Sequence, residues 1–221
     1  MRGGSDIRVI NIYTGWLIIL EKLALSRIKQ SISEKINQQQ LGFRKGSDCN
    51  MAKILTWYNS SKMDYKKLLL IDIRKAFDSI DRKKLKEMIQ TDFKENDKTL
   101  LMNFIDIYEQ ISLEILGKVI YPSRGGPKGS SIVPLLFCYY LDHTIKNCWL
   151  HIPFKLQLYE DDIITQAKTI EDLNDIYFTM KSEFDKIGLL INTDKCNIIS
   201  DDVTDVIKDN INDKIIIPKK G

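Results

Sequence analysis

Apolar and polar residues recur along this chain with two periods, and these periods predict its helices and strands. Between Trp16 and Ile36, apolar side chains return every three or four residues, which is the period of an amphipathic helix. A second helix is expected to begin near the candidate cap Ser47. Further helices are predicted over residues 81–90, 98–108, 132–148 and 170–187, the last ended by Gly188.

Apolar runs and alternations predict the strands. Leu68–Ile73 reads as a buried strand with Asp72 near its end, and either Asp78 or Ser79 is expected to cap the helix that follows. A hairpin is predicted from two short strands separated by an acidic tip. These strands cover residues 155–159 and 163–167, and the tip is residues 160–162. Other short strands are expected near residues 113–119, 189–192 and 197–200.

The order of these elements predicts an α+β fold with a small, mainly antiparallel sheet covered by helices on one face. No internal repeat or low-complexity segment interrupts the pattern. From Asp201 onward the chain is charged and lacks a long apolar pattern. We expect this tail to lie loosely on the surface or to begin a further element.

The composition indicates a globular protein but does not identify its binding partner. The 221 residues are 43% hydrophobic and 29% charged, with 5 Pro and 11 Gly, which is the balance of a globular chain. A net charge of +3 leaves the partner open. The four cysteines and two histidines lack the spacing of zinc ligands. The apolar run Trp16–Leu20 is far shorter than a membrane span, so we expect a protein of the cytoplasm or nucleus with no membrane partner.

Acidic residues are the candidate ligands of a metal site. Asp72 ends an apolar strand, and Asp161 and Asp162 lie at the tip of a hairpin. If the two strands are neighbours, the three carboxylates converge, and oxygen ligands of this kind select Mg²⁺, with Mn²⁺ as a second possibility. A solvated hairpin tip is the alternative, since adjacent acidic pairs such as Asp201-Asp202 also arise without a role.

Six segments resemble the motifs of reverse transcriptases from retroelements without long terminal repeats, and of the related group II intron enzymes. The catalytic motifs are matched by LIDIRKAFDSI at residues 70–80, GPKGSSIVPLLF at 126–137, YEDD at 159–162 and GLLINTDKC at 188–196. Upstream, QLGFRKG at residues 40–46 and RVINI at 8–12 resemble fingers segments. All of these segments occur in the family's order.

The resemblance implies a palm fold and a role for each matched position. Asp72 and Asp161 would be the principal ligands of two Mg²⁺ ions, with Asp162 beside them and the backbone carbonyl of Ile73 on the nucleotide-side ion. Phe77 would lie under the sugar and exclude a 2′-hydroxyl; plain core packing is the alternative, and the two interpretations are compatible.

The same resemblance implies contacts to template and nucleotide. Gly129 would let a template base pair approach the backbone, and Lys128 would touch a phosphate. Arg44 and Arg8 would lie over the triphosphate, because a planar guanidinium suits phosphate oxygens. Lys195 would protonate the leaving pyrophosphate or support the site from behind. An ordinary loop glycine, a solvated arginine and a surface lysine are the alternatives for Gly129, Arg8 and Lys195.

The function that the resemblance implies is RNA-directed DNA synthesis, with an RNA template, a DNA primer and deoxynucleotides as partners. Residues 1–66 are expected to be fingers, 67–200 mainly palm and 201–221 a tail, with no recognisable thumb, endonuclease or zinc knuckle. Departures from the family pattern at Glu160, Lys128, Ser131 and Val9 favour a decaying copy whose fold survives better than its activity. A catalytically inactive remnant and a maturase-type palm remain alternative interpretations.

Overall fold

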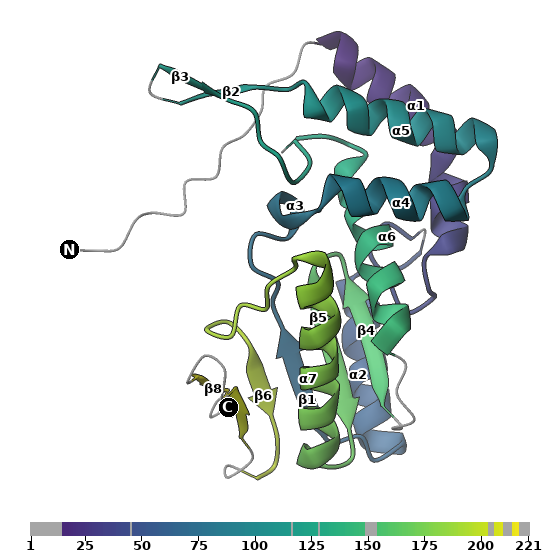
Figure 1. The fold of residues 1–221 in the computed structure, drawn as a ribbon. Coiled ribbons are helices and arrows are strands. Elements are labelled where there is room, and N and C mark those ends of the chain that lie inside the picture. Colours follow the sequence, from purple (N-terminus) through teal and green to yellow (C-terminus); the bar gives the residue numbers. More distant parts are fainter. Residues whose placement is uncertain are drawn as a thin grey trace.

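The computed structural model describes residues 15–44, 46–115, 117–127, 129–148, 154–202, 206–209 and 214–216. A four-stranded antiparallel sheet in the order β4-β5-β1-β6 forms one end of the molecule (Figure 1). Its strands are β1 (Lys67–Ile71), β4 (Lys155–Tyr159), β5 (Asp162–Ala167) and β6 (Asn197–Ile199). Its central strands are rich in leucine and isoleucine, which suits a sheet that is covered on both faces.

Helices cover both faces of this sheet. In Figure 1, α7 (Ile170–Ile187) lies in front of the sheet and α2 (Cys49–Lys62) lies behind it. Gln166 on β5 faces α2, where its side-chain nitrogen donates to the carbonyl of Thr56 at 3.1 Å. The α+β class with an antiparallel palm-like sheet is therefore confirmed. Helix α7, from the predicted palm, covers one face, whereas α2, from the predicted fingers, covers the other.

The remaining long helices form the other end of the molecule (Figure 1). They are α1 (Gly15–Lys35), α4 (Arg82–Asp92) and α5 (Glu95–Glu109), and α6 (Val133–Ile145) runs from them to the sheet. α6 continues as a 3₁₀ turn, η1 (Lys146–Cys148). Since α6 is buried on nearly all sides, its sequence is apolar all round, as expected for a central helix.

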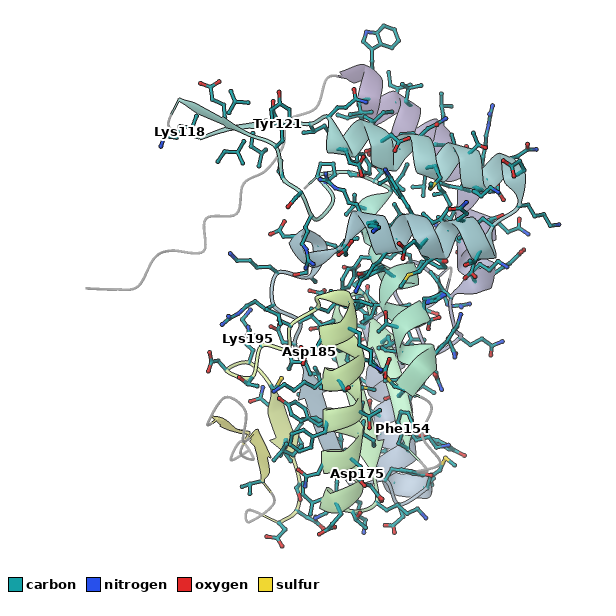
Figure 2. The ribbon with its side chains drawn as sticks, viewed as in Figure 1. Lys118, Tyr121, Phe154, Asp175, Asp185 and Lys195 are labelled. Atoms are coloured by element: carbon teal, nitrogen blue, oxygen red, sulfur yellow. The ribbon has the colours of Figure 1, made fainter. Side chains whose placement is uncertain are left out.

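Short elements complete the description. They are α3 (Ala76–Ser79), the hairpin of β2 (Leu113–Ile115) and β3 (Lys118–Ile120), and the pair β7 (Ile207–Asp209) and β8 (Lys214–Ile216). The β2–β3 hairpin projects from the helical end, and Figure 2 labels Lys118 and Tyr121 on it. Ile207 is fully buried and β7 lies against α7, so of the two expectations for the tail, the start of a further element fits this residue better than a loose attachment.

Two predicted helix caps are wrong by a few residues. Asp48, and not Ser47, caps α2, because its side chain accepts from the Met51 amide at 2.9 Å. Asp81 caps α4 by accepting from the amides of Lys83 and Lys84. Residues 76–79, including Asp78, instead form α3. The predicted C-cap is confirmed, since Gly188 adopts a left-handed conformation with φ of 76°.

Candidate active site

The sheet register brings Asp72 opposite Asp162. β1 and β5 pair antiparallel up to Ile71 and Ile163, so residues 72 and 162 occupy the next opposed positions. Directly opposed side chains in antiparallel strands have Cβ atoms about 5 Å apart. Leu69 and Ile71 are buried in the core, and Asp72 follows with the opposite side-chain direction. The predicted neighbourhood of the two strands is therefore correct.

The β4–β5 hairpin carries the other acidic residues at its tip. Tyr159 pairs with Asp162, which leaves Glu160 and Asp161 as a two-residue loop. Glu160 has φ of 58°, in the left-handed region that a non-glycine residue rarely adopts. Asp161 is thus presented directly after a strained residue, at the end of the sheet where β1 ends.

The carboxylates at this end repel one another. Burial first, and then the charges of Asp161 and Asp72, raise the pKa of Asp162, which Lys195 partly offsets. Burial and the charges of Asp161 and Asp162 likewise raise the pKa of Glu160. Glu160 is therefore a fourth acidic group in the electrostatic environment of the predicted site, as its departure from the family pattern suggested.

The loop after α7 supports Asp72. The Asn192 side chain donates to Asp72 Oδ2 at 2.9 Å, and the Asn192 amide donates to the Asp72 carbonyl at 2.8 Å. Lys195 Nζ lies 3.8 Å from Asp72 Oδ1. Figure 2 shows Lys195 at the end of the palm where α7 ends near Asp185, away from the end marked by Asp175. Sequence reasoning missed Asn192, although it lies within the quoted segment at residues 188–196.

The same loop sets the direction of the Ile73 backbone. The Asp72 carbonyl and the Arg74 amide bond to residues 192 and 190, on one side of the chain. In an antiparallel bridge, the N–H and C=O of the residue between them point to the other side. The Ile73 carbonyl is therefore directed toward the β5 side, where Asp161 and Asp162 lie.

Phe77 is half-buried and packs on the core. Its ring lies edge-on to that of Phe137 with centroids 5.3 Å apart, and its carbonyl accepts from the Gly126 amide at 3.1 Å. Core packing is thus present at Phe77, and it is compatible with the predicted place under a sugar.

The glycine-rich loop before α6 is held by buried side chains. Gly129 has φ of 101°, and the Ser130 hydroxyl accepts from the Ile132 and Val133 amides at the start of α6. Glu21, 1% exposed, accepts from the Ser131 amide at 2.8 Å. A glycine-rich loop, whose described residues are 124–127 and 129–131, thus leads directly into α6, whereas sequence reasoning gave Glu21 no role.

Arg44 contacts backbone, in an arrangement that the sequence did not suggest. Its Nε donates to the Gln40 carbonyl at 2.8 Å, and its Nη2 donates to the carbonyls of Ile36 and Asn37. These bonds tie the loop to the end of α1. A triphosphate contact would have to use Nη1. Arg8 and Lys128, the other predicted nucleotide or template contacts, lie outside the described residues.

The carboxylate oxygens at this end of the sheet are of the type that binds divalent cations. Asp72, Asp161 and Asp162 offer only oxygen atoms, which Mg²⁺ prefers, and their mutual repulsion is what a bound cation relieves. Within the described part of the chain, no three His, Cys, Asp or Glu side chains are arranged as a ready-made metal site. The acidic groups thus share an environment without forming a closed cage.

No helix among the described residues is long and apolar enough to cross a membrane.

Solved telomerase structures are similar to this chain in fold. Apo telomerase from Candida tropicalis matches with a TM-score of 0.59 and 16% identity, over 87% of this chain and 37% of that chain. Telomerase from Candida albicans in complex with a TWJ fragment of telomeric RNA matches with a TM-score of 0.51 and 14% identity, over 83% and 34%. The Candida tropicalis enzyme truncated from its C-terminal domain gives a TM-score of 0.50 and 18% identity, over 86% and 44%.

The chain spans less than half the length of these telomerase chains, and identities this low show the fold alone. The sequence itself matches the family described as "Reverse transcriptase (RNA-dependent DNA polymerase)" over residues 2–211. This chain therefore belongs to the reverse transcriptase family.

Proposed function

We propose that this chain is the polymerase core of a retroelement without long terminal repeats, adding deoxynucleotides to a primer 3′-hydroxyl on an RNA template. The observation that carries the proposal is the opposition of Asp72 and Asp162 across β1 and β5, with Asp161 at the adjoining hairpin tip. The family supports nucleotidyl transfer in general. The retroelement type rests on the quoted motifs.

Asp72, Asp161, Asp162 and the carbonyl of Ile73 would hold the metal ions. Two bound Mg²⁺ ions would lower the pKa of the attacking hydroxyl and stabilise charge on the leaving group. The chain's own contribution is to fix these oxygens before substrate arrives. Asn192 does this for Asp72 by bonding both its side chain and its carbonyl.

Further residues of the chain would bind and orient the substrates. Lys195 would hold a proton at Nζ for the leaving pyrophosphate, and its exposed side chain near Asp72 is compatible with that role. Phe77 would exclude a ribose 2′-hydroxyl. Gly129 would admit a template base pair, because its left-handed backbone carries no Cβ. Arg8, Arg44 and Lys128 are proposed as phosphate contacts.

We also propose the division of the chain into fingers over residues 1–66 and palm over residues 67–200. The position of α2 on the face opposite α7 supports this division.

A catalytically inactive remnant is the second candidate, and Glu160 is the observation that favours it. A unit charge at 4 Å from a phosphate costs about 4 kcal/mol at an effective dielectric of 20. That cost alone would slow turnover by about a thousandfold. The remnant would keep the palm fold and at most weak nucleic-acid binding.

Primer extension on an RNA template, with Mg²⁺ or Mn²⁺ and the purified chain, separates the two candidates. We expect incorporation by the wild type and its loss in Asp161→Ala. The matched control is Asp175→Ala, an exposed aspartate at the far end of α7 (Figure 2). No incorporation by a wild type that circular dichroism shows to be folded would overturn the polymerase proposal in favour of the remnant.

A further inference from the structure

A buried glutamine from the fingers loop holds the tip of the catalytic hairpin. Gln40 is 0% exposed. Its side-chain Nε2 donates to the Glu160 carbonyl at 3.2 Å, and its Oε1 accepts from the Glu160 amide at 3.0 Å. One primary amide thus pairs with both backbone groups of a single residue, as a neighbouring strand would.

The backbone around Gln40 fixes the position of this amide. The Leu41 amide donates to the Leu158 carbonyl at 2.7 Å, and the Leu158 amide donates to the Gln39 carbonyl at 2.9 Å. Residues 39–41 therefore extend the sheet at the free edge of β4, through a parallel bridge between Gln40 and Leu158. The Gln40 amide cannot move far from the hairpin unless these bonds break.

Gly42 completes the contact from the other side. Its amide donates to Gln40 Oε1 at 3.0 Å, which orients the side-chain amide. A Cβ added at Gly42 would lie 2.7 Å from the Glu160 nitrogen, so the loop touches the tip backbone directly. Only glycine allows this approach.

Glu160, the residue that Gln40 bonds, has a backbone conformation that needs support from its surroundings. Glu160 has φ of 58°, and a left-handed conformation costs a non-glycine residue about 1–2 kcal/mol. Its part-buried backbone N–H and C=O would also lose their partners if the amide were absent, at up to about 1–3 kcal/mol for each group left unsatisfied. Without Gln40, other turn conformations of this two-residue loop become competitive.

We propose that Gln40 is a positioning residue that sets the orientation of Asp161, and through it the catalytic acidic pair, by locking the backbone of Glu160. The inference rests on the proposed polymerase function only where its test reads activity. It predicts that the hydrogen-bonding pattern of the side chain at position 40, and not its size, determines turnover.

Gln40→Glu tests this pattern by pH. The protonated carboxyl has one donor and one acceptor and can replace both bonds of the amide, whereas the ionised form cannot donate to the Glu160 carbonyl. Burial favours the protonated carboxyl at this position, whereas the Gly42 and Glu160 amides that donate to it favour the ionised form. As the carboxyl ionises with rising pH, the ratio of variant to wild-type kcat should fall, by about tenfold per pH unit once ionisation is nearly complete. KM for the nucleotide should change by less than about threefold, because the nucleotide contacts are untouched.

Gln166→Glu is the matched control. Gln166 is also 0% exposed and also donates to backbone carbonyls, those of Thr56 and Tyr65, but it lies at the opposite end of β5 from the tip. This variant should lose stability while its kcat ratio stays flat with pH. Circular dichroism at each pH confirms that both variants are folded during the assay.

A readout without activity separates this inference from the proposed function. In Gln40→Met, which keeps the size of the side chain, exchange of the Glu160 amide with solvent should accelerate by about tenfold or more by NMR. Gln166→Met should leave that amide protected. If the wild type is inactive but protection of Glu160 depends on Gln40, the polymerase proposal fails and the positioning inference stands. Unchanged protection, or a pH-independent kcat ratio in Gln40→Glu, overturns the inference.

Discussion

Two loops meet the predicted catalytic centre, and they are held in opposite ways. The tip of the β4–β5 hairpin is set by strand register and by one neutral amide, that of Gln40. Among its described residues, the glycine-rich loop before α6 pairs with no strand, and two buried charged side chains, those of Glu21 and Arg82, bond to its backbone. The difference indicates that damage to the first loop should affect activity more than stability, and damage to the second should do the reverse.

The charged groups add to the few main-chain bonds of this loop, in which the Gly125 amide donates to the Ile80 carbonyl at 2.8 Å and the Gly126 amide donates to the Phe77 carbonyl at 3.1 Å. Arg82, 7% exposed, donates to the carbonyls of Gly125 at 2.7 Å and Pro122 at 2.8 Å, and burial lowers its pKa. Glu21 accepts from the Tyr108 hydroxyl and the Ser131 amide, each at 2.8 Å. Irregular backbone has no ladder to satisfy its polar groups, so side chains must do so. A hairpin needs such help only at its tip.

Replacing Arg82 should have the largest effect on stability. Arg82→Met keeps much of the packing volume but leaves at least two carbonyls of the glycine-rich loop without their donor. Bonds to a charged group contribute about 1.5–3 kcal/mol each, so we expect the free energy of unfolding in urea to fall by about 3 kcal/mol. Lys83→Met, at the exposed neighbouring position, should change it by less than about 0.5 kcal/mol. Equal effects of the two variants would refute the role of Arg82.

Gly42→Ala should disturb the contact between the Gln40 loop and the tip of the β4–β5 hairpin. The new Cβ would lie 2.7 Å from the Glu160 nitrogen, so the tip or the loop must shift. Overpacking of this kind costs about 1–3 kcal/mol, and we expect about 2 kcal/mol here. If the chain is active, primer extension should fall by a larger factor than this stability loss explains. Gly46→Ala is the control, since its left-handed φ of 82° is strained by alanine but no atom lies near the new Cβ.

Glu21→Gln should have a smaller effect on the glycine-rich loop. The amide keeps the shape of the carboxylate but retains only one oxygen, so either the Tyr108 hydroxyl or the Ser131 amide must face an NH₂ group. The tyrosine hydroxyl can rotate to accept a hydrogen bond from that NH₂ group. This limits the loss in the free energy of unfolding, measured in urea, to about 1 kcal/mol. A loss as large as that of Arg82→Met would mean that charge, and not hydrogen bonding, stabilises this loop.

Regular elements and local motifs could be predicted from the sequence. Periodicity located the long helices, and the apolar runs located β1, β4 and β5, because burial of one face dictates these patterns. The convergence of Asp72 with the hairpin tip was conditional on the two strands being neighbours, and the register that opposes Asp72 to Asp162 comes from the structure alone. Caps were less secure: adjacent residues such as Ser47 and Asp48 are equally good candidates, and only backbone geometry chooses between them.

Contacts between distant segments could not be predicted. Gln40 and Glu160 are separated by 120 positions in the chain, and Glu21 and Ser131 by 110. Glutamate in an amphipathic helix normally faces solvent, so nothing in the pattern of α1 marks Glu21 as buried. Arg44 shows the converse limit: a motif suggested a phosphate ligand, and the structure shows two of its nitrogens bonded to backbone carbonyls.

The smallest expected stability effect concerns the acidic tip itself, and it depends on pH. Burial and neighbouring charges raise the pKa values of Glu160 and Asp162 above their ordinary range. A raised carboxyl pKa means that the folded state binds protons more tightly than the unfolded state. Stability from this source is therefore fully present below about pH 4 and is lost as pH rises through the raised pKa.

Glu160→Gln removes one of these charges while leaving the backbone strain at position 160 unchanged. It should raise the melting temperature at pH 7. The corresponding gain in the free energy of unfolding is at most about 1 kcal/mol because solvent screens the group, and it should vanish near pH 4. Asp64→Asn is the control: Asp64 also has a left-handed φ, of 60°, but it pairs with Lys66 and should gain nothing. In primer extension, Glu160→Gln should be faster than the wild type, since one fewer carboxylate faces the triphosphate. A variant that is neither more stable at pH 7 nor faster would show that the Glu160 charge is screened, and that hairpin geometry alone limits this site.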